Sequence, residues 1–324
     1  MNKKVAILFP CIGRRVSLLR LFRAACRRLG CEGIMVGTDT TENSAALQCC
    51  DRQYVVKPVT HRDYPGQIKE IVKREKVMLL VPTVDLDLSI WARRRAALSD
   101  LGCRTLISTS RVVRICQDKR LTFAFLKKHG FATPDTLSAS QALRLKRPCY
   151  PYFLKPWDGH AGRGNAVARN REELKFYTRR VPNCIVQEFV EGAEYTVDVL
   201  VDFDGKVRCV VPRRRLAVRA GEVSKGITVK HAEIIGQSRL LVEKLKAGPG
   251  VITIQCFLTG QGCIKFIEIN PRFGGGVPLS IQAGADFPRW LLEMLLGRQG
   301  KIRLDGWRDG LTMLRYDEAV WVRK

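Results

Sequence analysis

Residues 251–272 read VITIQCFLTGQGCIKFIEINPR, and this stretch gives the clearest structural signal in the chain. Two apolar runs, 251–258 and 263–270, are separated by Thr259-Gly260-Gln261-Gly262, which is typical of a tight turn. The stretch therefore predicts a β-hairpin, with its two strands side by side in a sheet.

Three side chains that carry oxygen atoms converge on one face of this predicted hairpin. Glu268 and Asn270 are two positions apart, so they share a face of their strand. With Gly260-Gln261 at the centre of the turn, Gln255 opposes Phe266 on that same face, diagonal to Glu268. Because none of the three is a His or a Cys, the set suits a hard divalent cation such as Mg²⁺, completed by water and phosphate. A solvated strand face is the alternative interpretation.

The composition is that of a globular protein with more than one domain. The chain has 324 residues and is 46% hydrophobic. Its length predicts about two to three domains. No apolar run approaches the roughly 18 residues of a membrane span, and Pro10, Arg14 and Arg15 interrupt the first apolar run too early for a signal peptide. The 12 cysteines lack C-x-x-C spacing, so buried thiols are favoured over disulfides. We therefore expect a cytoplasmic protein that does not contact a membrane.

The formal net charge of +25 is the main anomaly of the composition. Strong basicity is typical of proteins that bind nucleic acid or another polyanion. Here Lys and Arg are spread along the chain, clusters such as Arg93-Arg94-Arg95 are short, and no nucleic-acid-binding motif is present. A generally basic surface, or cations that serve phosphate and carboxylate ligands inside a cleft, also explain the charge. A nucleic-acid partner therefore stays open but is not favoured.

Strand-like and helix-like segments alternate over the first 108 residues, which predicts a parallel sheet covered by helices. Ligands of such sheets lie beyond the carboxyl ends of the strands. Asp39, Thr83 and Asp85 follow predicted strands and are candidates to face a substrate, or else helix caps and loop residues. The predicted strands are 3–9, 33–38, 77–82 and 104–108, and the predicted helices are 16–29, 65–76 and 86–100.

Two common nucleotide-binding motifs are missing from the sequence. The first turn holds a single glycine, Gly13, where G-x-G-x-x-G is needed for close approach to a pyrophosphate. The G-x-x-x-x-G-K-[ST] loop is also absent from the chain. The sequence thus disfavours a dinucleotide-binding protein and an ordinary P-loop NTPase.

A glycine-rich loop follows in the middle of the chain. Residues 110–130 predict a helix that contains Asp118-Lys119-Arg120. Residues 152–155 predict a strand that leads into PWDGHAGRG at 156–164, and 166–169 predict a returning strand. Such a loop can lay backbone N–H groups over phosphates, and Lys155 just before it can neutralise phosphate oxygens.

The next segments complete the pattern. Residues 184–190 predict an apolar strand that carries Gln187 and Glu188. Backbone groups after such a strand can bind an adenine ring, and a carboxylate a few residues on can hold ribose hydroxyls. Residues 197–201 and 206–212 then predict antiparallel strands.

Taken in order, these motifs resemble the ATP-grasp superfamily, in particular the ATP-binding unit of the carbamoyl-phosphate synthase large chain and stand-alone carboxylate–amine ligases. The resemblance covers nearly the whole chain, and the ordered series is more specific than any single motif. The matched series is Asp118-Lys119, Lys155 with its glycine-rich loop, Gln187-Glu188-Phe189-Val190-Glu191-Gly192, Glu194-Tyr195, Arg213, Gln255 and Glu268-Ile269-Asn270-Pro271-Arg272.

The resemblance implies ATP and Mg²⁺ as cofactors, with Mn²⁺ as a substitute for Mg²⁺. Gln255, Glu268 and Asn270 would be the metal ligands, and Arg272 and Lys155 the catalytic residues that stabilise the transferring phosphoryl group. The nucleotide would contact a larger set: Lys119, Lys155, Gly159, Gly162 and Gly164 at the phosphates, Glu188, Phe189 and Val190 at the adenine, Glu194, favoured over Glu191, at the ribose, and Arg213.

The implied fold is mixed α/β and α+β. A Rossmann-like parallel α/β domain (1–108) would precede two ATP-grasp subdomains, 109–185 and 186–324, the second with an antiparallel sheet and the metal site. The implied enzyme is a ligase in which a small-molecule carboxylate attacks the γ-phosphate of ATP, and an amine displaces phosphate from the acyl phosphate. A single such unit argues against carbamoyl phosphate synthesis. A homodimer is compatible with the sequence, and a non-catalytic nucleotide- or nucleic-acid-binding protein on a degenerate ATP-grasp fold is the alternative.

Overall fold

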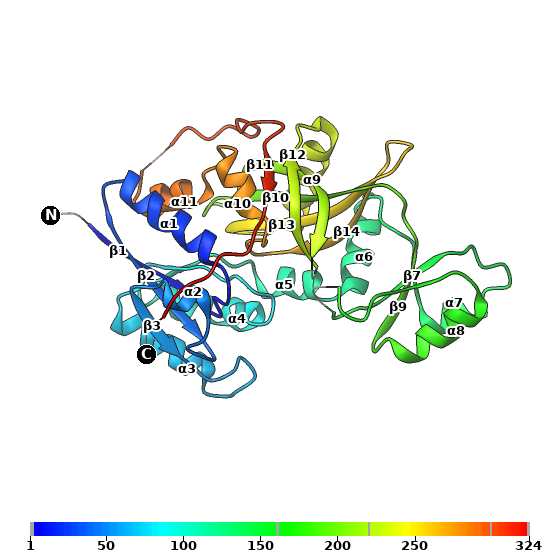
Figure 1. The fold of residues 1–324 in the computed structure, drawn as a ribbon, viewed down its shortest axis with the longest axis horizontal. Helices are drawn as coiled ribbons and strands as arrows, with labels where there is room; N and C mark the ends of the chain where they lie inside the picture. Colours follow the sequence, from blue (N-terminus) through cyan, green and yellow to red (C-terminus); the bar gives the residue numbers. More distant parts are fainter. Residues whose placement is uncertain (1–2, 160–161, 220, 299, 323–324) are drawn as a thin grey trace.

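The structure, a computed structural model, describes residues 3–159, 162–219, 221–298 and 300–322. Its elements form an elongated molecule with three β-sheets, each with its own set of helices (Figure 1). The N-terminal sheet lies at one end, a small sheet lies at the other end, and the largest sheet lies between them.

The N-terminal part is a parallel sheet covered by helices, as the alternation of segments predicts. The strand order is β3-β2-β1-β4-β5, so the chain builds the sheet outward from β1 to one edge and then from β4 to the other. The crevice beyond the carboxyl ends of β1 and β4 is therefore the expected ligand site. β4 and β5 are shorter than predicted, and β3 was not predicted because it is a short, largely exposed edge strand. The elements are β1 (Lys4–Phe9), α1 (Val16–Arg28), β2 (Glu32–Asp39), α2 (Ala45–Gln48), β3 (Arg52–Val55), α3 (Tyr64–Arg74), β4 (Leu79–Leu80), α4 (Leu88–Ser99) and β5 (Arg104–Thr105).

The predicted helix over 110–130 is wrong, because the chain forms two helices there. Asp118 has an extended backbone (φ −113°, ψ 109°), and its carboxylate accepts a hydrogen bond from the Arg120 N–H, so it ends one helix and caps the next. The two helices, α5 (Ser110–Gln117) and α6 (Lys119–Lys128), both pack against the strand that carries Glu268.

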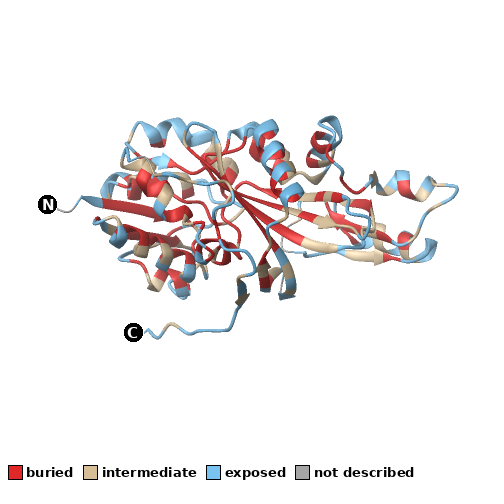
Figure 2. Ribbon diagram, turned by 90° about the horizontal axis from the view of Figure 1, so that it is seen from above, coloured by how far each residue is buried: buried red, intermediate tan, exposed pale blue. Residues whose placement is uncertain are grey.

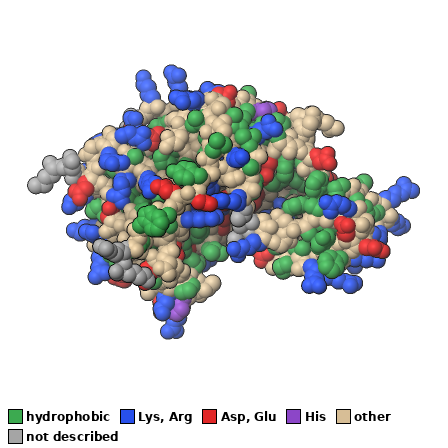
Figure 3. Space-filling model, viewed as in Figure 1, with side chains coloured by type: hydrophobic (Ala, Val, Ile, Leu, Met, Phe, Trp, Pro, Cys, Tyr) green, Lys and Arg blue, Asp and Glu red, His purple; other side chains and the backbone are tan. Residues whose placement is uncertain are grey.

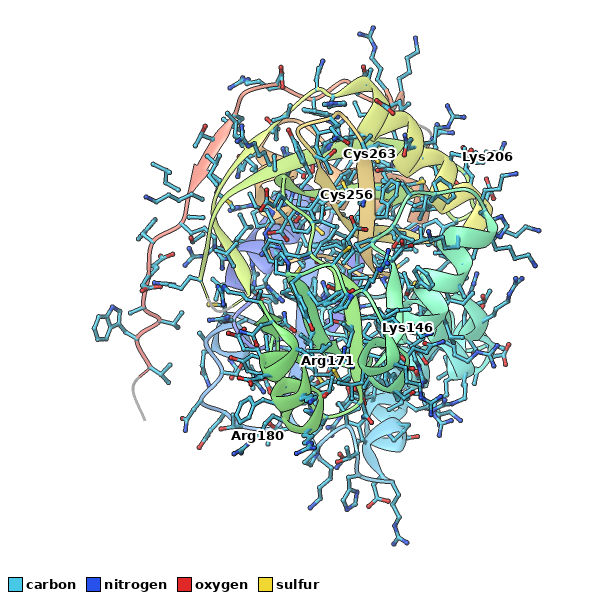
Figure 4. All side chains as sticks on the ribbon, turned by 90° about the vertical axis from the view of Figure 1, so that its right-hand side faces the viewer. Lys146, Arg171, Arg180, Lys206, Cys256 and Cys263 are labelled. Carbon is cyan, nitrogen blue, oxygen red and sulfur yellow. The ribbon has the colours of Figure 1, made fainter. Side chains whose placement is uncertain are left out.

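The small sheet has the order β6-β9-β7-β8 and a core of its own around Leu154, Leu174 and Val186. Since β9 runs to Glu188 in this sheet, we propose to draw the boundary of this part after Glu188 rather than after residue 185. Arg171 and Arg180 lie at the two ends of its helix α8 (Figure 4). The elements are β6 (Thr136–Ser138), α7 (Ala139–Arg144), β7 (Tyr152–Pro156), β8 (Ala166–Ala168), α8 (Arg171–Arg180) and β9 (Cys184–Glu188).

The central sheet is antiparallel, with the order β14-β13-β10-β11-β12-β15. Its apolar face shares one hydrophobic core with the N-terminal part, where α1 packs against α11, and this core appears as the buried band through the middle of Figure 2. The elements are β10 (Ala193–Val201), β11 (Val207–Arg219), β12 (Glu222–Thr228), α9 (Ala232–Leu245), β13 (Gly250–Leu258), β14 (Ile264–Asn270), α10 (Val277–Gln282), α11 (Phe287–Leu295) and β15 (Thr312–Leu314).

The β13–β14 hairpin forms, but its register differs from the predicted one. Gly262 has φ +79°, a conformation that glycine adopts without strain, and Thr259 and Cys263 close the turn around three residues rather than two. Phe266 therefore pairs with Cys256 on the core side. A β-bulge next to Gln255 then places Gln255 directly opposite Glu268.

All 12 cysteines lie in the described part of the chain, and none of them forms a disulfide. Cys256, for example, is buried in β13, whereas Cys263 is exposed in the turn that follows (Figure 4). Among the described residues, no helix is long and apolar enough to cross a membrane.

Candidate active site

A cavity of about 700 Å³ lies along the polar face of the central sheet, between this sheet, the small sheet and the loops that follow β1 and β4. Figure 3 shows the surface hollowed between the small sheet and the rest of the molecule, with Lys and Arg side chains beside Asp and Glu. The cavity is lined by every predicted site residue except Gly164: Lys119, Lys155, Gly159, Gly162, Glu188, Phe189, Val190, Glu194, Arg213, Gln255, Glu268, Asn270 and Arg272.

The proposed metal ligands meet on β13 and β14. Gln255 pairs with Glu268 across the two strands, and Asn270 follows two residues further along β14. The hairpin thus gathers the side chains that the sequence indicated, although the bulge, not simple alternation, sets their register. The Gln255 carboxamide fits its neighbours when its nitrogen donates to Glu268 Oε2 and its oxygen accepts from Arg215 Nη1, each over 2.9 Å.

These residues fit a hard divalent cation. As metal ligands they would use oxygen atoms, from one carboxylate and two carboxamides, and the Gln255 oxygen also accepts from Arg215. Mg²⁺ is commonly held by one or two carboxylates with phosphate oxygens and water. In the described residues, no cluster of three or more His, Cys, Asp and Glu side chains offers a competing site. The Glu268 carboxylate supplies the negative charge next to Lys155 and Arg272. Its own contribution is to raise the pKa of each, because it favours their charged forms.

Arg215 is a site residue that the sequence analysis missed. Its Nη1 donates to Glu194 Oε1 over 2.7 Å, and the same nitrogen reaches the Gln255 oxygen. Only 7% of its side chain is exposed. Arg213 and Arg215 are two positions apart on β11, so alternation along a strand would have placed both on the cavity face.

Glu194 joins this network from β10. Burial raises the pKa of the Glu194 carboxyl, Glu268 raises it further, and Arg215 opposes the shift. Arg215 engages only Oε1 of Glu194, so the other carboxylate oxygen can accept a hydrogen bond from a polar ligand, which suits the proposed ribose contact.

Two lysines stand at the phosphate end of the cavity. Lys155 is 7% exposed, and burial lowers the pKa of its ammonium to about 8, with Lys119 adding to the shift and Glu268 opposing it. The Lys119 ammonium donates to the carbonyl oxygen of Gly159. Neither ammonium forms an ion pair with a described carboxylate, so both can stabilise an anionic ligand such as a polyphosphate.

The glycine-rich loop covers these lysines only in part. Gly159 and Gly162 line the cavity, whereas Gly164 packs against Pro156 and does not. Residues 160 and 161 of the predicted loop lie outside the described residues.

The proposed adenine slot begins where β9 ends. Glu188, Phe189 and Val190 all line the cavity, and the Glu188 carboxylate forms an ion pair with Lys265 on β14. The Asp135 N–H lies 3.4 Å from the other oxygen of that carboxylate, Oε2. Lys265 was not predicted, although it stands next to Phe266 on a strand already assigned to the site.

Arg213 forms a buried ion pair within the cavity wall. Its Nε and Nη2 donate to the two oxygens of Asp198 over 2.8 and 3.1 Å, and the two side chains are 1% and 0% exposed. Ser280 and Thr253 donate to the same carboxylate. Asp198 engages Nε and Nη2, and Nη1 is buried without a hydrogen-bond partner among the described residues, so a direct contact between Arg213 and the nucleotide is a proposal.

Two ion pairs connect the N-terminal sheet to the central sheet at the far end of the cavity. Asp85, which follows β4, accepts from Arg272, and Arg15, which follows β1, donates to Glu222 on β12 over 2.9 Å. Both N-terminal residues lie beyond the carboxyl ends of β1 and β4, where the strand order reverses. The second pair, Arg15 and Glu222, was not predicted.

The three loop candidates of the N-terminal sheet have different environments. Asp85 and Thr83 line the cavity. Asp39 instead accepts hydrogen bonds from the N–H groups of Gly13 and Thr40 over 2.9 and 2.8 Å, so it organises the loops around it.

Two family models match the chain. One, described as "ATP-grasp in the biosynthetic pathway with Ter operon", matches residues 180–318. The other, described as "PylC-like, N-terminal domain", matches residues 7–106. Together they cover the N-terminal sheet and the metal-ligand strands.

Curated relatives are distant in sequence. The carbamoyl phosphate synthase large chain of Gemmatimonas aurantiaca is 23% identical over 284 residues, which are 80% of this chain and 26% of the relative. The chain therefore spans about a quarter of the length of that relative. The tyramine–L-glutamate ligase of Methanocaldococcus fervens is 23% identical over 221 residues, which are 67% of this chain and 66% of the relative.

Solved structures share the fold. The biotin carboxylase domain of the Hydrogenobacter thermophilus 2-oxoglutarate carboxylase, in complex with MgADP, ADP and bicarbonate, superimposes with a TM-score of 0.76 at 18% identity, over 94% of this chain and 73% of that one. An ADP complex of N5-carboxyaminoimidazole ribonucleotide synthetase gives a TM-score of 0.68 at 19% identity, over 94% of this chain and 79% of that one. With the family models, these matches confirm the predicted fold class. The chain thus resembles the ATP-grasp superfamily, whose family model matches residues 180–318.

Proposed function

We propose that the chain is an Mg²⁺- and ATP-dependent ligase that activates a carboxylate as an acyl phosphate and joins it to an amine. The observation that carries this proposal is the order of groups along one cavity. Along β14 and the residues after it, Lys265 pairs with Glu188 at the base slot, Glu268 lies next to Lys155, and Arg272 pairs with Asp85, which follows β4. This order matches the sequence of base, phosphates, metal and acid that the reaction needs.

The residues of the chain would bind and orient the nucleotide. Glu188 and the backbone after it would hold the adenine, and Glu194 the ribose. Lys119 and Lys155 would neutralise phosphate oxygens, which is most of what phosphoryl transfer demands of a protein. Gln255, Glu268 and Asn270 would hold Mg²⁺, which adds positive charge at the transferring phosphoryl group.

The acid would bind at the arginine end of the cavity. Asp85 and the Phe273 carbonyl engage three N–H groups of the Arg272 guanidinium, and the remaining N–H on each Nη would contact the carboxylate or the acyl phosphate. The carboxylate oxygen attacks the γ-phosphorus, ADP leaves, and the acyl phosphate stays in the cavity away from water. The amine nitrogen then attacks the acyl carbon, and phosphate leaves.

Both substrates would be small molecules. The names of the tyramine–L-glutamate ligase and of other relatives describe ligation or formylation of small molecules, which supports this class for the chain. The free cysteines support the prediction of a cytoplasmic protein, and a homodimer also stays a prediction.

The degenerate, non-catalytic alternative has no observation in its favour, because the three proposed metal ligands line one cavity with both lysines. The test is release of ADP and phosphate from ATP in a screen of acids paired with amines. We expect release that needs both substrates and Mg²⁺. Tight ATP binding without acid-dependent ADP release from any pair would favour the non-catalytic alternative.

A further inference from the structure

A second cavity, of about 780 Å³, meets the nucleotide cavity at Glu268 and Asn270. Its walls come from helices α4 and α5 on one side and from Lys119 and the segment Trp157–Gly159 on the other. It therefore gives a second approach to the proposed metal site, one that the proposed roles of ATP and of the acid do not use.

Three arginines from two helices line this second cavity. Ser89 Oγ donates to Gln117 Oε1 over 2.7 Å, so the last turn of α5 lies beside the first turn of α4. One turn further along α4 comes Arg93, and one turn back along α5 comes Arg114. Arg111 follows one more turn back, and we call Arg93, Arg111 and Arg114 the arginine triad.

The side chains of the arginine triad have no ion-pair partner in the described part of the chain. None of the three guanidinium groups makes a hydrogen bond or an ion pair with residues 3–159, 162–219, 221–298 and 300–322. Arg94 and Arg95, the neighbours of Arg93 in the sequence, do not line the cavity.

The carboxylates of this cavity are committed elsewhere. Asp85 accepts from Arg272, and Asp118 accepts from Arg120 over 3.0 and 2.7 Å. Asp158 accepts from Asn183 over 2.9 Å. Glu268 is the fourth carboxylate of the cavity, and none of the four forms an ion pair with the triad.

The nucleotide cavity differs in this respect. Four of its five arginines have a carboxylate partner among the described residues, as the pairs Arg15–Glu222, Arg213–Asp198, Arg215–Glu194 and Arg272–Asp85 show, and Arg163 in the glycine-rich loop is the exception. Like charges that share a cavity repel one another, and a bound anion relieves that repulsion. One guanidinium group can bind two phosphoryl oxygens at once, so a site with three guanidinium groups suits a phosphoryl group.

We propose that the arginine triad is a binding site for the phosphoryl group of one of the two substrates. That substrate carries its reacting acid or amine at the Glu268 and Asn270 end, and its phosphoryl group lies between α4 and α5. The inference rests on the proposed ligase function, because it assigns this phosphorylated molecule to the same reaction.

The test is titration calorimetry of the full chain, with Mg²⁺ and a non-hydrolysable ATP analogue saturating the nucleotide cavity. The probes are glycerol phosphate, inorganic phosphate and citrate. We expect saturable binding of glycerol phosphate at one site, tighter than that of citrate. If inorganic phosphate binds as tightly as glycerol phosphate, the triad recognises the phosphoryl group alone.

Three variants locate the site. Arg111→Gln/Arg114→Gln and, separately, Arg93→Gln should each weaken glycerol phosphate binding by roughly tenfold or more, since hydrogen bonds to charged groups are lost. The double variant Arg94→Gln/Arg95→Gln removes the same charge outside the cavity and should change binding by less than about twofold. All these side chains are exposed, so melting temperatures should stay close to that of the parent.

Three results would overturn the proposal. They are the absence of saturable phosphate binding, an equal loss of affinity in the Arg94→Gln/Arg95→Gln control, and tighter binding of citrate than of glycerol phosphate. Affinity for the ATP analogue, measured in the same samples, is a separate readout. A protein that does not bind the ATP analogue would contradict the proposed function. The proposal for the triad is tested separately, by the binding of glycerol phosphate and inorganic phosphate.

Discussion

Arg272, two residues after the last residue of β14, donates to both oxygens of Asp85, which follows β4 in the N-terminal sheet. The Nε–Oδ1 distance is 3.0 Å and the Nη2–Oδ2 distance is 2.6 Å. The pair is 187 residues apart in sequence, and it fixes the guanidinium at the edge of the cavity that holds Glu268. Arg272 therefore has a structural partner in addition to its proposed role at the phosphoryl group.

Two substitutions separate these two roles. Arg272→Lys removes the planar fork but keeps the charge, and we expect nucleotide affinity within a few-fold and kcat lower by about 100-fold. Asp85→Asn breaks the same ion pair and leaves the guanidinium in place, so it should lower the melting temperature with a much smaller loss of kcat. Equal loss of melting temperature in both variants, with kcat intact in both, would assign Arg272 to structure alone.

Lys155 predicts a pH dependence of nucleotide binding. Its pKa is lowered to about 8 by burial, so the ammonium loses its charge as the pH rises above that value. Phosphates bind the charged form, so nucleotide affinity should be full below pH 8, and it should fall by up to about tenfold per pH unit above it, with proton uptake on binding.

Titration calorimetry in buffers of different ionisation enthalpy measures this proton uptake directly. In Lys155→Arg the guanidinium stays charged, so the affinity should be flat over the same range. A parent protein whose affinity does not change across this range would show that Lys155 does not contact the phosphates.

Glu268→Gln tests the metal site. The change is nearly isosteric and keeps a partner for the Gln255 carboxamide, so the melting temperature should change little. Turnover should fall by about 100-fold or more, because the site loses its carboxylate. Removal of divalent ions with a chelator should abolish turnover in the parent protein, and Mn²⁺ should restore part of it. Parent-like turnover in purified Glu268→Gln would refute the metal assignment.

Arg213 should behave as a structural residue. Arg213→Gln leaves Asp198 buried without its charged partner, a change that costs about 3–5 kcal/mol of stability. Chemical denaturation measures this loss, and nucleotide affinity per folded molecule should stay within a few-fold. A large loss of affinity with stability unchanged would instead support the direct nucleotide contact that the family resemblance implies.

The Lys265–Glu188 pair should orient the base slot. Lys265→Met removes the ammonium that holds the Glu188 carboxylate, so KM for ATP should rise several-fold while kcat changes little. Lys265→Arg should restore most of the affinity. A fall in kcat with KM unchanged would place Lys265 at the chemical step rather than at the base.

Local patterns in the sequence predicted the residues that lie close together in the chain. The two-residue spacing of Glu268 and Asn270 places both on one face of β14, and the glycine-rich segment after Lys155 indicates a phosphate loop. The bulge that sets Gln255 opposite Glu268 has no sequence signal of its own, because it depends on how β13 and β14 pair.

Contacts between distant segments could not be predicted. Arg15 and Glu222 are 207 residues apart, and only the packing of the N-terminal sheet against the central sheet brings them together. Arg93 looked like one member of a surface cluster, and its separation from Arg94 and Arg95 depends on the packing of α4 beside α5. Arg215 is different, because the alternation along β11 would have identified it.

The central claim is that the chain makes an acyl phosphate from ATP and a carboxylate. The most direct test supplies acids with isotopically labelled carboxylate oxygens, ATP, Mg²⁺ and hydroxylamine in place of the unknown amine. The account predicts ADP and a hydroxamate in equal amounts, with one labelled oxygen transferred to the released phosphate for each hydroxamate formed. Formation of AMP and pyrophosphate, or release of phosphate that carries no label, would contradict it.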